Sequence, residues 1–173
     1  MAKFVSPLRL YHVVLIAIAL SLGSAAMAKR DETVDRVAIE QLTVEYSYLL
    51  DHGRANELAD LFTPDGVFDN PNIGLHAEGR EAIGTYYAKR AADPRTTRHI
   101  STNLHIIFET PDRATGTRLI TYYRGDGPGP IFPAEPGSVS EYSEIYQRGT
   151  DGKWRFAYRN NRHLFSGSTD TEK

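Results

Sequence analysis

Apolar residues in the first half of the chain recur at every third or fourth position, which predicts amphipathic helices. The longest such segment runs from Thr33 to about His52 and places one apolar stripe on a single helical face: Ile39, Leu42, Tyr46, Leu49 and Leu50. A short second helix is expected over residues 55–62, because the turn-forming residues at 63–66 follow it. A third helix is expected over residues 81–92.

The second half of the chain changes to the two-residue alternation of β-strands. Segments rich in β-branched and aromatic residues predict four strands over residues 99–109, 115–124, 139–148 and 154–165, and a shorter strand begins at Val67. Turn residues at 111–112 and 151–152 favour antiparallel connections. Helices followed by a run of strands indicate an α+β fold.

The N-terminal segment has the layout of a secretory signal peptide. Lys3 and Arg9 precede an apolar run over residues 13–20, and the small residues of Ala26-Met27-Ala28 suit a cleavage site. An uncleaved membrane anchor is the alternative, but the apolar run is short for a bilayer span of about 20 residues. We therefore expect a signal peptide over residues 1–28 and a periplasmic or secreted protein without a stable membrane anchor after processing.

Composition describes one globular domain over residues 29–167 with a disordered polar tail over 168–173. The formal charge is −2 and becomes −4 when Lys3 and Arg9 are removed, which argues against a nucleic-acid surface. The chain has no cysteine, which excludes disulfides, thiolate metal sites and thiol catalysis.

Four polar residues in apolar surroundings carry the candidate chemistry: Tyr46, Asp51, His99 and Arg162. A carboxylate and an imidazole held together in an apolar cavity form a general acid/base pair. Arg162 shares strand parity with the aromatic residues of its segment, so it needs a partner if it is buried. The alternatives are a solvated helix end for Asp51, a structural role for His99 and a solvent position for Arg162.

Aromatic and polar residues near these four are the candidate pocket lining. The expected substrate-binding residues are Phe68, Asn103, Tyr122, Phe132, Tyr142 and Trp154. Phe132 belongs to a Gly/Pro-rich loop over residues 125–137, which is either a plain connection or a lid over the pocket. No His-x-His or His-x-x-x-His pair supports a metal site, and no cofactor is expected.

The stretches over residues 46–51, 58–68, 79–83 and 98–103 resemble the SnoaL-like branch of the nuclear-transport-factor-2-like superfamily. The resemblance implies a cone-shaped α+β barrel, in which three helices pack on a strongly curved mixed sheet that encloses one pocket. Within this family the order of Tyr46, Asp51, His99 and Arg162 is similar to the bile acid 7α-dehydratase type. The Asp-His pair is shared with scytalone dehydratase.

The resemblance and the residues together predict a cofactor-independent dehydratase that eliminates water β to a carbonyl in a hydrophobic polycyclic or aromatic substrate. A ketosteroid-type double-bond isomerase and a non-catalytic periplasmic binding protein are the alternatives. A ring-hydroxylating dioxygenase small subunit shares the fold, but a signal peptide disfavours it.

Apolar residues of parity opposite to His99 predict an oligomer. Ile100, Leu104, Ile106 and Phe108 share this parity, and a bent sheet cannot cover all of them with three helices. We expect a homodimer or homotrimer through this face.

Overall fold

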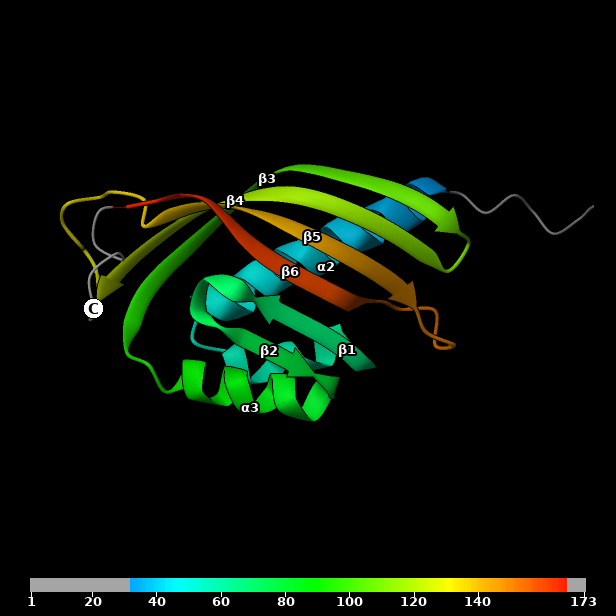
Figure 1. Cartoon of the computed structure of the whole chain (residues 1–173), viewed down its shortest axis with the longest axis horizontal. Coiled ribbons are helices and arrows are strands. Elements are labelled where there is room, and N and C mark those ends of the chain that lie inside the picture. The colour runs from blue at the N-terminus through cyan, green and yellow to red at the C-terminus, as the bar shows by residue number, and fades with distance from the viewer. Residues whose placement is uncertain (1–31, 168–173) are drawn as a thin grey trace, which may run out of the picture. The chain divides into compact units, whose positions relative to one another are not determined.

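The computed structural model describes residues 32–167, which form an α+β unit (Figure 1). The signal peptide predicted over 1–28 and the tail predicted over 168–173 lie outside the described residues. Within residues 32–167, no helix is long and apolar enough to cross a membrane.

The three predicted helices are present: α2 (Glu32–Asp51), the 3-10 helix η1 (Ala55–Leu61) and α3 (Gly79–Ala91). A further short 3-10 helix, η2 (Pro71–Ile73), lies between η1 and α3 in the chain. The apolar stripe of α2 is buried, with Ile39 at 0% and Tyr46 at 2% exposure, because this face packs into the core.

Six strands form one mixed sheet in the order β2-β1-β6-β5-β4-β3. The strands are β1 (Phe62–Asn70), β2 (Leu75–Glu78), β3 (Arg95–Thr110), β4 (Arg113–Asp126), β5 (Ser138–Arg148) and β6 (Trp154–Ser166). Of the five neighbouring strand pairs in this described sheet, β1 and β6 pair in parallel and the other four are antiparallel. The turn predicted at 63–66 is instead an irregular part of β1, where the register with β6 shifts. The short strand β2 was not predicted from the sequence.

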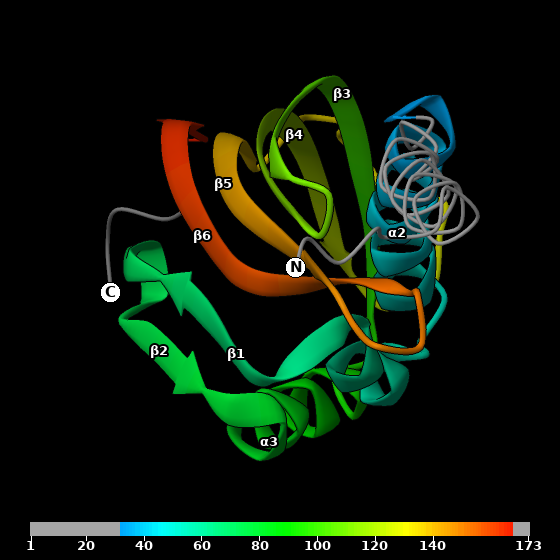
Figure 2. The same ribbon diagram turned by 90° about the vertical axis from the view of Figure 1, so that its right-hand side faces the viewer.

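The sheet is curled but not closed, and the helices pack on it (Figure 2). One core joins residues of α2, η1 and α3 to inward-facing residues of the strands, among them Phe62, Ile106, Tyr146 and Phe156. The predicted fold class is therefore confirmed, with an open curled sheet in place of a full barrel.

A β-bulge in β3 changes which side chains face the core. The β3–β4 register shifts between Thr102 and His105, and Asn103 adopts the left-handed conformation with φ of 56°. One extra residue reverses the alternation, so Leu104, Ile106 and Phe108 pack in or against the core. The predicted apolar outer face is wrong for these three residues; of that set Ile100 stays exposed.

A second bulge lies in β6. Tyr158 pairs with Ile145 and Phe156 pairs with Tyr146, which leaves Ala157 as the extra residue. Trp154 and Phe156 are buried before the bulge, whereas Arg159 and Asn161 are buried after it. The bulge therefore reverses the parity on which the burial of Arg162 was predicted.

Candidate active site

Asp51 is the last residue of α2, where the negative end of the helix dipole disfavours a carboxylate. Its carboxylate is compensated by donors from β3. The His99 backbone N–H donates to Oδ2 at 2.7 Å, and the Thr97 hydroxyl donates to Oδ1 at 2.8 Å. Thr97 and His99 both reach Asp51 because they share strand parity on β3.

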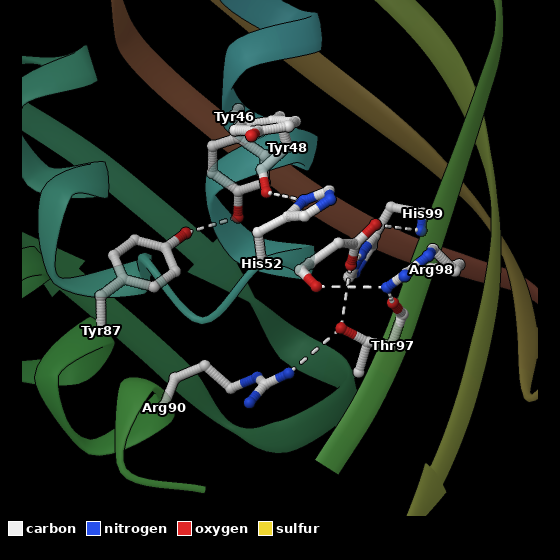
Figure 3. A network of polar contacts seen from close by, with 9 residues as sticks. Tyr46, Tyr48, His52, Tyr87, Arg90, Thr97, Arg98 and His99 are labelled. Carbon is white, nitrogen blue, oxygen red and sulfur yellow. Dashed lines mark hydrogen bonds and ion pairs between the residues drawn. The ribbon is translucent and has the colours of Figure 1, made fainter. Parts of the chain in front are cut away.

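The imidazole of His99 is hydrogen-bonded to the same carboxylate, with Nδ1 2.6 Å from Oδ1 of Asp51 (Figure 3). The two side chains are 11% and 6% exposed, so little water competes for this bond. Burial alone would raise the pKa of Asp51, but the hydrogen bonds and charge of His99, with the bond from Thr97, lower it. Asp51 is therefore an ionised partner that fixes the orientation of the ring.

Arg90 of α3 extends this network. Its Nη2 donates to Oγ1 of Thr97 at 3.2 Å, so a chain of hydrogen bonds runs from Arg90 through Thr97 to Asp51 (Figure 3). The Tyr122 ring lies beside His99, with ring centroids 4.8 Å apart, because these residues are directly paired across β3 and β4.

Tyr46 lies deeper, on the core-facing side of α2. Its hydroxyl is 2.5 Å from that of Tyr87, and the guanidinium carbon of Arg159 lies 3.3 Å from its ring centroid. Burial raises the pKa of Tyr46 well above its ordinary value, although the charge of Arg159 opposes this shift. Tyr46 is therefore a protonated phenol at neutral pH, which suits a hydrogen-bond donor.

A buried charge network lies behind the tyrosines. Glu144 forms ion pairs with Arg118 and Arg159, each with a nitrogen–oxygen distance of 3.2 Å, and it accepts a 2.5 Å hydrogen bond from the Tyr146 hydroxyl. Burial alone would raise the pKa of Glu144, but the charges of Arg118 and Arg159 lower it. Two arginines facing one glutamate leave a net positive charge beneath Tyr46 and Tyr142.

A cavity of about 190 Å³ lies over this network and beside His99. It is lined by side chains of α2, α3 and five of the strands. Among the predicted site residues, the lining includes Tyr46, Phe68, His99, Tyr122 and Tyr142. Asp51 is not in the lining and lies behind His99.

Four predicted site residues lie elsewhere. Arg162 is 63% exposed and pairs with Glu141 at 2.9 Å, because of the bulge at Ala157. Asn103 is exposed at the bulge of β3. The prediction that Arg162 and Asn103 lie in the pocket is therefore wrong, because the bulges change the strand parity on which it was based.

The other two are aromatic. Phe132 is 82% exposed and is not in the lining, so the structure does not support a lid role for it. Trp154 is buried, but its Nε1 donates to Asp35 at 3.2 Å and its ring packs on Phe108. Trp154 therefore belongs to the core between α2 and the sheet.

Sequence reasoning missed several residues at or beneath the pocket: Thr97, Tyr87, Arg90, Arg118, Glu144 and Arg159. Thr97 was detectable, because it shares the parity of His99 once the strand is extended to Arg95. Arg159 was not detectable from alternation, since the bulge gives it the parity of the predicted outer face. Within residues 32–167, no three histidine, aspartate or glutamate side chains lie together as a metal site.

Comparison with known proteins places the chain in a known family. The model of the SnoaL-like domain matches residues 31–160, and the chain belongs to the SnoaL-like family. No curated protein matches the chain.

Three solved structures illustrate the similarity. A protein from Novosphingobium aromaticivorans assigned as a scytalone dehydratase is 26% identical, with a TM-score of 0.69, over 82% of this chain and 91% of that chain. A protein from Catenulispora acidiphila in complex with S-DNPA is 29% identical, with a TM-score of 0.60, over 76% of this chain and 94% of that chain. An NTF2-like protein with a cystatin-like fold from N. aromaticivorans is 24% identical, with a TM-score of 0.64, over 90% of this chain and 92% of that chain. This similarity shows a shared fold.

Proposed function

We propose that the protein is a cofactor-independent dehydratase, which removes water β to a carbonyl in a small hydrophobic substrate. The observation that carries the proposal is the buried Asp51–His99 pair at the wall of a semi-enclosed cavity. The similarity to a protein assigned as a scytalone dehydratase supports the same reaction class.

His99 is the proposed base. Its Nδ1 is held by the ionised Asp51, so the proton on Nδ1 fixes the tautomer in which Nε2 carries the lone pair. Nε2 abstracts the proton next to the carbonyl, and the resulting imidazolium is stabilised by Asp51. The same proton is then given to the leaving hydroxyl, which departs as water.

Tyr46 is the proposed donor to the carbonyl oxygen as enolate charge develops. Its phenol lines the cavity and stays protonated, and Arg159 beneath its ring stabilises negative charge that shifts towards the tyrosine. Arg159 acts through Tyr46 and is a positioning residue. It takes the place that the sequence assigned to Arg162.

The test is turnover of a panel of aromatic β-hydroxy ketones and acids, with products identified by mass spectrometry. His99→Ala and Asp51→Asn are each expected to lose about 10²–10⁴-fold in rate, as for loss of a general base. His52→Ala is the matched control, because His52 adjoins Asp51 in sequence but is exposed and bonded to the Tyr48 carbonyl.

The outcomes separate the alternatives. Loss of one water from the substrate supports the dehydratase, whereas an unchanged mass with a shifted double bond assigns the same base to an isomerase. Wild-type turnover in both variants would refute the acid/base mechanism. Ligand binding without any turnover would favour the binding protein.

Two further expectations stay predictions: a periplasmic or secreted location and a homodimer or homotrimer. Light scattering of residues 29–167 tests the second, and a monomer mass would contradict it. The apolar residues left on the outer sheet face for such a contact include Ile100 and Ile107, which are 51% and 55% exposed.

A further inference from the structure

Three arginines line one end of the cavity: Arg90 of α3, Arg95 of β3 and Arg124 of β4. No aspartate or glutamate of the described residues is part of the same lining. The charged atoms that a ligand meets at this end are therefore cationic.

The sheet register places Arg124 opposite Thr97, which is also the residue that Arg90 contacts. Thr97 is directly opposite Arg124 in the β3–β4 pair, so their side chains share the face that His99 and Tyr122 also use. Arg90 reaches the same point from α3, because its Nη2 donates to Thr97. Thr97 lies two positions from His99 along the strand, which corresponds to about 7 Å.

The three arginines differ in how well their charge is compensated. Arg95 forms an ion pair with Asp93. Within residues 32–167, the ion pair of Arg124 is a loose one with Asp126, at 3.7 Å, and Asp126 is 91% exposed. Arg90 has no ion pair to a carboxylate within residues 32–167; it donates to the Thr97 hydroxyl and to the Asp93 carbonyl.

Arg90 is also partly desolvated. Burial, followed by the nearby charge of Arg95, lowers the pKa of Arg90. A guanidinium has five N–H donors, and one bond to Thr97 with a long one to a carbonyl leaves most of them for another acceptor. A planar cation of this kind is suited to a carboxylate.

The cavity also limits the size of the ligand. An apolar cavity of about 150 Å³ is known to accommodate benzene, so a cavity of about 190 Å³ is suited to one ring with a small substituent. Phe68, Tyr86 and Tyr142 give it aromatic walls.

We propose that Arg90 and Arg124 form a carboxylate-binding subsite, which selects single-ring aromatic acids and holds the reacting carbon at His99. The inference rests on the proposed function, in that it assigns the substrate class to the same pocket. It replaces the polycyclic substrate by a smaller, anionic one.

The experiment is calorimetric titration of the protein with benzoate and with benzamide, a neutral molecule of nearly the same shape. Wild-type protein is expected to bind benzoate at least about tenfold more tightly than benzamide, since charge-assisted hydrogen bonds are stronger than neutral ones. Arg90→Gln and Arg124→Gln are each expected to weaken the affinity for benzoate about tenfold and to change the affinity for benzamide by less than about twofold.

Arg162→Gln is the matched control, because it removes the same charge from an exposed position outside the pocket. It is expected to leave both affinities within about twofold of wild type. Arg124→Gln keeps the test valid if Arg90→Gln disturbs the Thr97–Asp51 network, since Thr97 is hydrogen-bonded to Arg90 and Asp51.

Equal binding of benzoate and benzamide by the wild type would overturn the proposal. An equal loss in Arg90→Gln and Arg162→Gln would also overturn it, because it would show only long-range attraction. His99→Ala distinguishes this inference from the dehydratase mechanism: it should keep the benzoate preference while losing turnover. A preserved benzoate preference with no turnover in any protein would refute the mechanism and leave the subsite standing.

Discussion

Replacing Glu144 by glutamine should destabilise the protein far more than the same change at Glu141, three residues earlier on β5. Glu144 is fully buried and is the carboxylate that compensates both Arg118 and Arg159. Glu144→Gln keeps the size of the side chain and leaves two buried cations without a counter-charge. Removing one partner from a buried ionic group costs about 3–5 kcal/mol.

Glu141→Gln is the control within the same strand. Glu141 pairs with Arg162, and the side chains are 35% and 63% exposed, so the pair contributes about 0–1 kcal/mol. Urea unfolding followed by circular dichroism measures both free energies of unfolding. The expected difference corresponds to a lower melting temperature for Glu144→Gln by roughly 10 °C. A difference under about 1 kcal/mol between the two variants would refute the reasoning.

The pH dependence gives a second measure of the same residue. Because the pKa of Glu144 lies below its ordinary value of 4.5 in the folded state, its stabilisation is complete above that pH. The stabilisation is lost as the pH falls through the folded-state pKa. Wild type and Glu141→Gln should therefore lose stability in acid more steeply than Glu144→Gln, and equal acid slopes would contradict the assignment.

Two substitutions test the packing of the sheet and the bulge of β3. Gly116→Ala would place Cβ 2.9 Å from Cε2 of Tyr146 and 3.0 Å from the His105 carbonyl, so we expect a loss of about 1–3 kcal/mol. Gly84→Ala on α3 is its control: Cβ would meet Ala59 at 3.5 Å, and the higher helix propensity of alanine should stabilise by up to about 1 kcal/mol. Asn103→Ala should cost about 1 kcal/mol at its φ of 56°, whereas Asn103→Gly should be nearly neutral. Thermal unfolding decides both pairs, and a harmless Asn103→Ala would argue against the left-handed bulge.

Much of the fold and part of the site could be predicted from local pattern. The helical spacing of Ile39, Leu42 and Tyr46 predicts which face of α2 is covered, and the structure buries that face. Asp51 and His99 were recognisable as candidates from their positions within their own elements. Asp51 lies at the end of a helix, and His99 has a fixed parity near the start of a strand. The structure joins them at 2.6 Å.

The sequence by itself determined the α+β order and the helical faces, since each depends on residues close together in the chain. It also singled out Asp51 and His99 individually, but these residues are 48 positions apart and only the fold brings them into contact. Only the tertiary structure decided which arginine of β6 is buried. The extra residue at Ala157 reverses the alternation of β6 and buries Arg159 in place of Arg162. The bulge at Asn103 likewise turned Ile106 and Phe108 inwards. A bulge results from the pairing of one strand with its neighbours and the curvature of the whole sheet, so period-two alternation within a single strand cannot reveal it.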